Sequence, residues 1–287
     1  MTTTSPADDI RHGLGTLTPA ERKVAHVLLA AYPSAGLETV ATVADRAAVS
    51  APTVLRFVGR LGYKGFPDFQ AALRRELGAR NASPLVLYEA AEPTSRTSSA
   101  DGLLKRSTAL FGDALAQTLG EIPPHDLQTA VTLLADRKRR IVLAGGRFTH
   151  LIARYLGLHL MQLRDDVHLL SDRDVERTAT LAAINRRDVV VIFDYRRYEN
   201  DKLTIARLTQ ENGGKVIVFT DTWLSPATPH AAVVLSSRGD APSPYDSLVP
   251  TLAVVETLVA GVVSCLADRA HRRMKHGEET ARRIDLV

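Results

Sequence analysis

Hydrophobic positions in the first third of the chain repeat with the period of an α-helix. Thr18, Pro19 and Glu21 stand in the order expected at a helix start, as N-cap, first-turn proline and capping-box acid. Apolar residues then recur on one side of each segment, and Gly62 is a typical helix stop. The pattern predicts four helices, over about residues 18–29, 40–47, 50–62 and 66–77.

The pattern changes in the second part of the chain. Two helical stripes, around residues 103–115 and 127–134, precede an alternation of short apolar runs with helical segments. The runs of strand length lie at residues 141–144, 167–170, 189–193, 216–219 and 233–235. A long apolar helix is expected from about Ser247. Because strands that alternate with helices pair in parallel, the sequence predicts an α/β three-layer fold with a parallel sheet.

Between these two parts, residues 81–102 are rich in serine, proline and asparagine and show little periodicity after residues 85–88. Such composition is typical of an inter-domain linker. We therefore expect an all-α domain over residues 1–80, a linker over 81–102, and an α/β domain over 103–287.

Composition is that of a soluble globular protein. Hydrophobic residues make up 45% of the 287 positions and charged residues 24%, which excludes a disordered or collagen-like chain. The single cysteine, Cys265, has no internal partner, so a reducing compartment is expected. The first residues lack a cationic start followed by an apolar stretch, so no signal peptide is expected and the predicted location is cytoplasmic.

Residues 248–267 form a mostly apolar segment that is long enough to span a bilayer. The segment contains Pro250 and Glu256, and a carboxylate in mid-bilayer costs a few kcal/mol. We therefore interpret it as a buried helix of the α/β domain and expect no membrane partner.

Positive charge is concentrated in one part of the chain. The net charge is only +4, yet residues 40–80 contain seven basic residues and three acidic ones. In the same stretch a short helix, a turn through residues 48–50 and a second helix have the spacing of a helix-turn-helix, which places its second helix in the major groove of DNA. We predict that Ala51, Thr53, Arg56 and Arg60 are the exposed positions of that helix. The alternative is a plain helical hairpin.

The segments LTPAERKVAHVLL and VATVADRAAVSAPTVLRFVGRLGYKGFPDF closely resemble the N-terminal domain of RpiR-type bacterial transcriptional regulators. The resemblance implies that Phe57 and Phe66 are core residues and that operator DNA is the partner. The residues expected at or near the DNA are Ser50, Ala51, Thr53, Arg56, Arg60 and Lys64.

In RpiR-type regulators the DNA-binding domain is joined to a sugar isomerase (SIS) domain that senses a phosphosugar. The resemblance therefore implies a SIS-like domain here, but two of its loops depart from the family pattern. The first loop usually reads G-x-G-x-S, and residues 145–149 read GGRFT. The later loop usually reads S-x-S-G-x-T, and residues 194–199 read DYRRYE, without a serine or threonine.

These loops follow predicted strands, and ligands of parallel sheets bind at the carboxyl ends of strands. Arginine forks suit carboxylate or phosphate groups, so we predict a small anionic effector, a sugar phosphate or another carbohydrate-derived or organic acid. The predicted effector-binding residues are Gly145, Gly146, Arg147, Thr149, Asp194, Tyr195, Arg196, Arg197, Ser243 and Ser247. The alternative is a degenerate pocket whose arginines pair with Asp194, Glu199 or Asp201, or support a dimer interface.

Other chemistry is not expected. The nine histidines show no HxxxH or HxH pair and no cysteine partner, so no metal site is predicted. Gly145 and Gly146 do not belong to a dinucleotide fingerprint, and no cofactor is expected. Asp201 and Lys202 are interpreted as surface charges.

The sequence thus predicts a non-enzymatic transcriptional regulator that binds operator DNA and a small anion and forms a homodimer or higher homo-oligomer. Paired DNA half-sites match a two-fold protein. The alternatives are a SIS-fold sugar-phosphate isomerase or related lyase, and a protein-interaction module that binds no small molecule.

Overall fold

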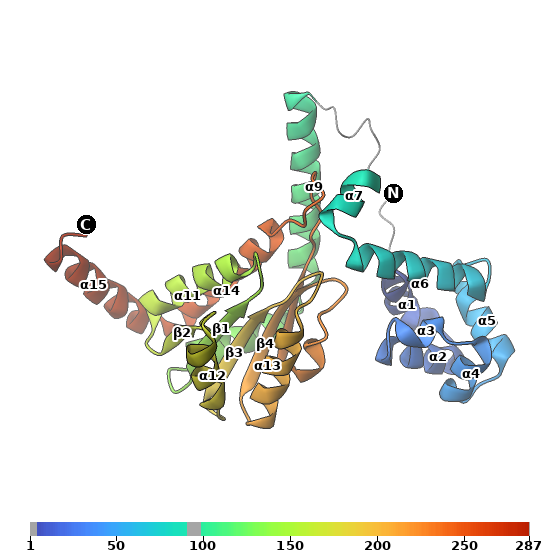
Figure 1. The fold of residues 1–287 in the computed structure, drawn as a ribbon, viewed down its shortest axis with the longest axis horizontal. Helices are drawn as coiled ribbons and strands as arrows, with labels where there is room; N and C mark the ends of the chain where they lie inside the picture. Colours follow the sequence, from blue (N-terminus) through green and yellow to red (C-terminus); the bar gives the residue numbers. More distant parts are fainter. Residues whose placement is uncertain (1–4, 91–98, 287) are drawn as a thin grey trace. The chain divides into compact units, whose positions relative to one another are not determined.

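The computed structural model describes residues 5–90 and 99–286. The chain divides into two compact units, Met1–Ala82 and Ser83–Val287. Each unit has its own hydrophobic core. The first unit consists of helices and the second is built on a sheet (Figure 1).

The first unit is all helical, as the sequence predicts. Its helices are α1 (Pro6–Gly13), α2 (Pro19–Ala30), α3 (Ser34–Leu37), α4 (Val40–Ala47), α5 (Ala51–Arg60) and α6 (Phe66–Asn81), with a 3-10 turn η1 (Leu14–Thr16). The predicted capping box is present, because the Thr18 side chain accepts from the Glu21 backbone and the Glu21 side chain accepts from the Thr18 backbone. Helices α1 and α3 were not predicted, since each is too short to show a helical period.

The core of this unit fixes how the helices meet. Phe57 and Phe66 are buried, which confirms their assignment to the core, and they pack with residues of α2, α4 and α6. Gly36 in α3 lies so close to α6 that a Cβ atom there would stand 2.4 Å from a side-chain carbon of Leu73. A glycine is therefore needed at this crossing.

The segment predicted as a linker contains helix α7 (Pro84–Ala90) in its described part, and the first residues of the next helix also fall within it. Residues 91–98 lie outside the described residues. Helix α9 (Ala100–Glu121) follows, with the Ser99 side chain accepting from the Gly102 backbone at its start. The boundaries of the predicted linker remain a prediction.

The described part of the second unit contains five strands, one at each of the five apolar runs in the sequence. The strands are β1 (Arg140–Gly145), β2 (Val167–Leu169), β3 (Asp188–Phe193), β4 (Lys215–Asp221) and β5 (Val233–Ser237). Their order is β2-β1-β3-β4-β5 and every pairing is parallel. The predicted fold class is confirmed.

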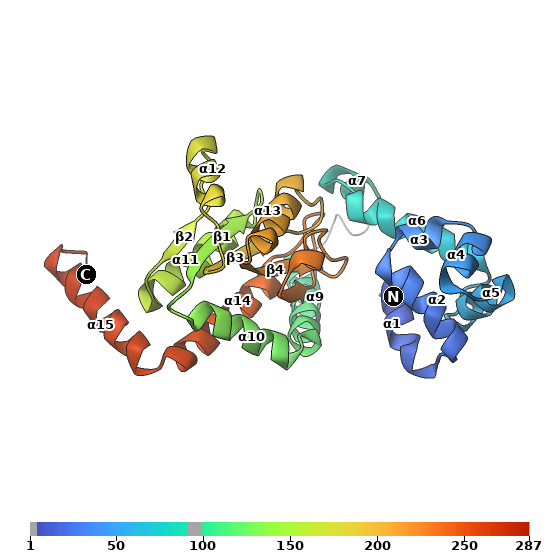
Figure 2. The same ribbon diagram turned by 90° about the horizontal axis from the view of Figure 1, so that it is seen from below.

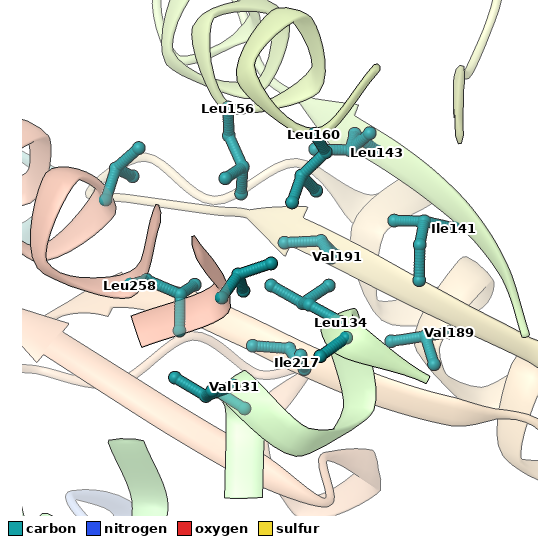
Figure 3. Close-up of a cluster of buried hydrophobic side chains, with 14 of the residues drawn as sticks. Val131, Leu134, Ile141, Leu143, Leu156, Leu160, Val189, Val191, Ile217 and Leu258 are labelled. Atoms are coloured by element: carbon teal, nitrogen blue, oxygen red, sulfur yellow. The ribbon is translucent and has the colours of Figure 1, made fainter. Parts of the chain in front are cut away.

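Helices cover both faces of the sheet. They are α10 (Pro124–Ala135), α11 (His150–Leu163), α12 (Asp174–Ala182), α13 (Asn200–Glu211) and α14 (Val249–Leu266). Helix α15 (Asp268–Arg283) follows α14 and packs against α11 and α14. Side chains of α10, α11 and α14 meet those of β1, β3 and β4 in the larger core (Figure 3). Alternate residues of the same strands, such as Val190 and Val218, pack with residues of α13 in a second cluster. Helix α13 lies on the face of the sheet opposite α10 and α14 (Figure 2).

Helix α14 is long and apolar enough, by composition, to cross a membrane. In the structure Val254, Val255, Leu258 and Val262 are at most 1% exposed and lie in the larger core. The segment thus packs as a helix of the α/β unit, as the sequence predicts.

Candidate functional site

The helix-turn-helix consists of α4, a turn over residues 48–50, and α5. Ala48 ends α4 with a left-handed backbone (φ 50°), and Ser50 precedes α5 with an extended one (φ −80°, ψ 150°). The Ser50 hydroxyl caps no backbone group of α5 and instead lies 3.0 Å from the Thr53 hydroxyl. Both Ser50 and Ala51 are exposed at the start of α5.

Thr53 is not an exposed position, which corrects the prediction. Only 6% of Thr53 is accessible, because Phe57 lies four residues later on the same helix face and is fully buried. The Thr53 hydroxyl lies 3.3 Å from Nη2 of Arg56, which donates to it. Thr53 therefore does not present its own side chain at the surface. Its hydroxyl accepts a hydrogen bond from Arg56 and so helps to position that exposed guanidinium.

The three predicted basic residues differ in how they are held. Arg56 is exposed and Lys64 is exposed in the turn after α5. Arg60 is tied back, with Nη1 donating to the Thr16 carbonyl at 2.8 Å and Nε lying 3.5 Å from the Glu21 carboxylate. Burial alone would raise the pKa of Glu21, but hydrogen bonds from Thr18 and the positive charges of Arg60 and Arg56 outweigh it and lower that pKa.

Three further residues of α5 are exposed that sequence reasoning missed. Pro52, Leu55 and Gly59 lie on the outer face, and Leu55 is 48% exposed. Leu55 and Gly59 follow Ala51 at intervals of four residues, and Pro52 precedes Arg56 by four, which was a signal available in the sequence. An exposed leucine beside Arg56 can contact a thymine methyl group in the major groove.

The second candidate site is a pocket at the carboxyl ends of β1 and β3. These strands are neighbours at the point where the strand order reverses, the place where open α/β sheets bind ligands. The pocket has a volume of about 200 Å³. Seven of the predicted effector residues line it, namely Gly146, Arg147, Thr149, Asp194, Tyr195, Arg196 and Arg197.

Three predicted residues do not line this pocket. Gly145 lies beneath the loop, where a Cβ atom would stand 2.5 Å from the backbone of His150. The Ser243 and Ser247 hydroxyls accept from the backbones of Tyr245 and Val249, at 3.3 and 3.1 Å, within their own turn.

Thr149 closes the first loop onto the sheet. Its hydroxyl donates to the Phe193 carbonyl at 2.9 Å and accepts from the Gly146 backbone at 2.7 Å. The Gly146 N–H, which a ligand could otherwise use, is therefore already engaged. In this chain the threonine holds the loop in place.

A carboxylate of the chain itself occupies the first loop. Oε1 of Glu199 accepts from the Arg147 backbone N–H at 3.1 Å and lies 3.7 Å from Nε of Arg147. Its oxygens would stand 3.0 and 3.4 Å from a Cβ atom on Gly146, so the carboxylate lies directly against the glycine. Glu199 thus takes up donors that an anionic ligand would need.

Lys202 is not a surface charge, which corrects the interpretation from sequence. It is 2% exposed, and its Nζ donates to Glu199 at 2.8 Å and to Asp201 at 2.9 and 3.0 Å. Asp201 also pairs with Arg177. The Lys202 ammonium binds Oε2 of Glu199 while Arg147 contacts Oε1, and the sequence pattern did not reveal this role.

The two arginines of the second loop have different surroundings. Arg196 has a side chain that is 9% exposed, pairs with Asp246 at 2.5 Å, and lies over the Trp223 ring at 5.6 Å. Arg197 lines the pocket without a hydrogen bond or ion pair to any residue in the described part of the chain. Its backbone is left-handed (φ 66°). Asp246 was not among the partners predicted for these arginines.

Asp194 and Tyr195 belong to buried networks at the pocket floor. Asp194 is 4% exposed and accepts from the Ser225 hydroxyl and from the Glu199 backbone at 3.2 Å. The Tyr195 hydroxyl lies 3.1 Å from that of Ser237 and accepts from Thr251 at 2.9 Å. Burial raises the pKa of Tyr195, which keeps its hydroxyl protonated.

Asp194 predicts a pH dependence of stability. Burial raises its pKa from 3.8 to about 6, against the lowering effect of Ser225, the Glu199 N–H and Lys202. The Asp194 carboxyl therefore stays protonated to a higher pH in the folded chain than in the unfolded chain. Its contribution to stability is present below about pH 4 and is lost as the pH rises to about 6. The loss amounts to at most about 3 kcal/mol in the free energy of unfolding.

We expect Asp194→Asn to remove this part of the pH dependence. Urea unfolding at pH 4.5, 5.5 and 7, followed by fluorescence of Trp223, the single tryptophan, measures it in the α/β unit. The difference in unfolding free energy between variant and wild type should shift in favour of the variant as the pH rises. A constant difference across these pH values would show that Asp194 titrates normally.

Comparison with known proteins agrees with both halves of the structure. The family described as helix-turn-helix domain, rpiR family, matches residues 6–80, and the SIS domain family matches residues 133–261. The chain belongs to the RpiR family. As an RpiR-family protein with a SIS domain, it is a helix-turn-helix transcriptional regulator that binds DNA.

Several relatives of this RpiR-family protein are similar over most of their length. The transcriptional regulator HexR of Escherichia coli is 28% identical over 88% of this chain and 86% of its own. HexR of Pseudomonas aeruginosa is 27% identical over 89% and 88%. The sugar isomerase domain of an RpiR transcription factor from Sphaerobacter thermophilus is 25% identical, with a TM-score of 0.57 over 62% of this chain and 98% of its own.

One solved structure is similar in fold over almost the whole chain. The NanR protein of Vibrio vulnificus, complexed with ManNAc-6P, has a TM-score of 0.54 at 17% identity and covers 98% of this chain and 99% of its own. Among the described residues of the RpiR-family protein, no group of three or more histidine, cysteine or acidic side chains is placed to hold a metal ion.

Proposed function

We propose that this protein regulates transcription by inserting α5 into the major groove of an operator. The observation that supports this most is the exposed face of α5, where Ser50, Ala51 and Arg56 reach the surface together with Leu55. Mobility-shift titrations with fragments of the upstream region test it. A lack of preference over random DNA at physiological salt would contradict the proposal.

We further propose that the pocket at the ends of β1 and β3 binds a small anionic metabolite that alters operator affinity. Arg197 supports this, because it lines the pocket and its charge has no partner in the described chain. A sugar phosphate or another carbohydrate-derived or organic acid fits an arginine in a small pocket. The ManNAc-6P bound to NanR, a protein of similar fold, is consistent with this class of effector.

The proposed mode of binding differs from the one expected from sequence. Arg147 and Arg196 are paired with Glu199 and Asp246, so Arg197 is the residue proposed to hold the acid group. Binding at the first loop requires the Glu199 carboxylate to leave. Glu199 thus competes with the ligand for the donors of Arg147, and it is proposed to set which anions the pocket accepts.

We expect Glu199→Gln to raise the affinity for an anionic effector by roughly tenfold or more, because two negative charges about 4 Å apart repel strongly in a partly buried site. A thermal-shift screen of organic acids and sugar phosphates against wild type and variant measures this. Glu211→Gln, at the other end of α13, is the control with the same change in charge.

The outcomes of this screen distinguish the proposal that the pocket binds an anion from the proposal that Glu199 competes with that anion. An anion that stabilises wild type and Glu199→Gln equally, but not Arg197→Ala, would support the pocket and remove the role of Glu199. An anion that acts equally on all variants binds elsewhere. If no anion stabilises either wild type or Glu199→Gln, the degenerate pocket becomes the better interpretation.

We also propose that the protein forms a homodimer or higher homo-oligomer through the α/β unit. Apolar side chains near the start of α9 are uncovered, with Leu103 44% and Leu104 69% exposed. An uncovered apolar face of this kind is typical of an interface. Sedimentation of the full chain at micromolar concentration should give at least a dimer, and a clean monomer would contradict the assembly.

The proposed function is non-enzymatic and cytoplasmic. The matched HexR proteins are named as transcriptional regulators, which favours regulation over isomerase activity. Three carboxylates line the described pocket and each is already engaged, Asp194 by Ser225, Glu199 by Lys202 and Asp246 by Arg196. General-base catalysis needs a group free to reach the substrate.

A further inference from the structure

A second group of charged residues lies at the amino ends of β1 and β2, the end of the sheet opposite the pocket. Arg137 comes from the turn before β1, and Arg269, Arg272 and Arg273 come from α15. Together with Leu163, Arg164 and Asp165 they line a hollow of about 280 Å³. Asp165 is the single carboxylate among these lining residues.

The turn that presents Arg137 is held from within by Arg164. This arginine is 1% exposed, and its guanidinium donates to the backbone carbonyls of Leu134 at 2.6 Å, of Asp136 at 2.9 Å, and of Arg139. Three carbonyls of one turn thus converge on one buried side chain. The backbone of the turn that carries Arg137 is therefore held by hydrogen bonds from a buried side chain rather than by contacts at the surface.

Helix α15 presents the other arginines on one side. Arg269, Arg272 and Arg273 have the i, i+3, i+4 spacing of a single helix face. The neighbouring stripe of the helix is buried, with Ala270 fully covered and Met274 packed on the core, and this sets the rotation of α15. All three arginines consequently border the same hollow.

The positive charge of this group is not balanced within the described chain. Asp165, itself 58% exposed, pairs with Arg137 at 3.3 Å and with Arg273. Arg269 and Arg272 are exposed and make no hydrogen bond or ion pair with any described residue. Both lie in the first two turns of α15, where the positive end of the helix dipole disfavours cations. Like charges three residues apart on a helix repel, so an anion beside both guanidinium groups would stabilise them.

We propose that Arg137, Arg269, Arg272 and Arg273 bind a small compound with two adjacent phosphate groups. Two unpaired arginines can each bind one phosphate through both nitrogens, and the two half-paired ones can add further donors. Five arginines line the hollow with one carboxylate and one apolar side chain, Leu163, so it suits a highly charged diphosphate group rather than an apolar molecule. This proposal is independent of the effector pocket and of Arg197.

The full-length protein and sodium pyrophosphate, at constant ionic strength, test the proposal by thermal shift and calorimetry. At a hundredfold excess over the dissociation constant, pyrophosphate should raise the melting temperature of the α/β unit by roughly 5–10 °C. The variant Arg269→Ala/Arg272→Ala should bind pyrophosphate at least tenfold more weakly. Without pyrophosphate this variant should melt no lower than wild type, because the repulsion is removed.

Matched variants make the result specific. Arg282→Ala/Arg283→Ala removes the same charge from the far end of α15 and should bind as wild type does. Arg197→Ala should also keep the pyrophosphate response, which separates this site from the pocket. A lack of stabilisation of wild type by pyrophosphate, or equal loss in both α15 variants, would overturn the proposal.

The phosphate groups bound by this cluster could instead belong to DNA, so duplex DNA of unrelated sequence is tested against the same variants. If Arg269→Ala/Arg272→Ala weakens DNA binding while wild type does not bind pyrophosphate, the cluster contacts a DNA backbone, and the small-ligand proposal is wrong. If pyrophosphate binds wild type and the variant retains full DNA affinity, the small-ligand proposal is supported.

Discussion

Replacing Arg164 with alanine is expected to lower the free energy of unfolding of the α/β unit by about 3–5 kcal/mol. Arg164 is among the largest fully buried side chains of the described chain. Its guanidinium donates to four backbone carbonyls, of Leu134, Asp136, Arg139 and Asp165. Burial lowers the pKa of the guanidinium, but not enough to remove its charge.

The size of this effect follows from what alanine leaves behind. Each buried carbonyl that loses its donor costs about 1–3 kcal/mol unless water reaches it, and the missing side chain leaves a cavity beside the core. The carbonyls of Leu134 and Asp136 belong to the end of α10, so the loss also loosens the connection between α10 and β1.

Urea unfolding followed by Trp223 fluorescence measures the expected loss, because this tryptophan lies in the α/β unit. Arg154→Ala, on the exposed side of α11, removes the same side chain where no described residue contacts it by hydrogen bond or ion pair. The control should change stability by less than about 0.5 kcal/mol. An equally small effect for Arg164→Ala would mean that water or a neighbouring side chain replaces its hydrogen bonds.

Replacing Arg56 with alanine is expected to weaken operator binding by about 1–3 kcal/mol, or roughly 5- to 150-fold, if Arg56 contacts a base edge. Arg56 is the exposed basic residue in the middle of α5, and the Thr53 hydroxyl is within hydrogen-bond distance of its guanidinium. Arg60 is tied to Thr16 and Glu21 and should have a smaller effect.

Mobility-shift titrations at several salt concentrations distinguish the possible contacts of Arg56. Loss of a base contact relaxes the preference for the operator over unrelated DNA, whereas loss of a phosphate contact weakens both and lowers the salt dependence by about one unit. Arg74→Ala, an exposed arginine on α6, controls for the change in charge. If Arg56→Ala and Arg74→Ala bind the operator equally, α5 does not read it through Arg56.

Most of the fold could be predicted from periodicity. The five apolar runs became the five strands, and the capping pattern at Thr18 gave the start of α2 within the first unit. Patterns of this kind report burial averaged over a segment. They do not resolve a single position, and Thr53 was placed on the wrong side of α5 for that reason.

The electrostatics of the site could not be predicted, because the partners come from distant elements. Arg147 and Glu199 are 52 positions apart, and Arg196 and Asp246 are 50 apart. A lysine at the start of a helix is usually exposed, yet Lys202 is buried because Glu199 and Asp201 compensate its charge. Which acid meets which base is decided by the arrangement of loops along the sheet edge.

The backbone of Arg197 has a consequence for how this chain tolerates change. A left-handed conformation costs an arginine about 1–2 kcal/mol, whereas glycine adopts it freely and asparagine with little penalty. Selection for thermostability alone would therefore replace Arg197 early and gain from doing so. Its retention in an engineered library screened only for heat resistance would be unexpected, and its loss there would also delete the unpaired charge in the pocket. The left-handed backbone of Arg197 thus lowers the stability of the fold, and in return the loop places one cation in the pocket.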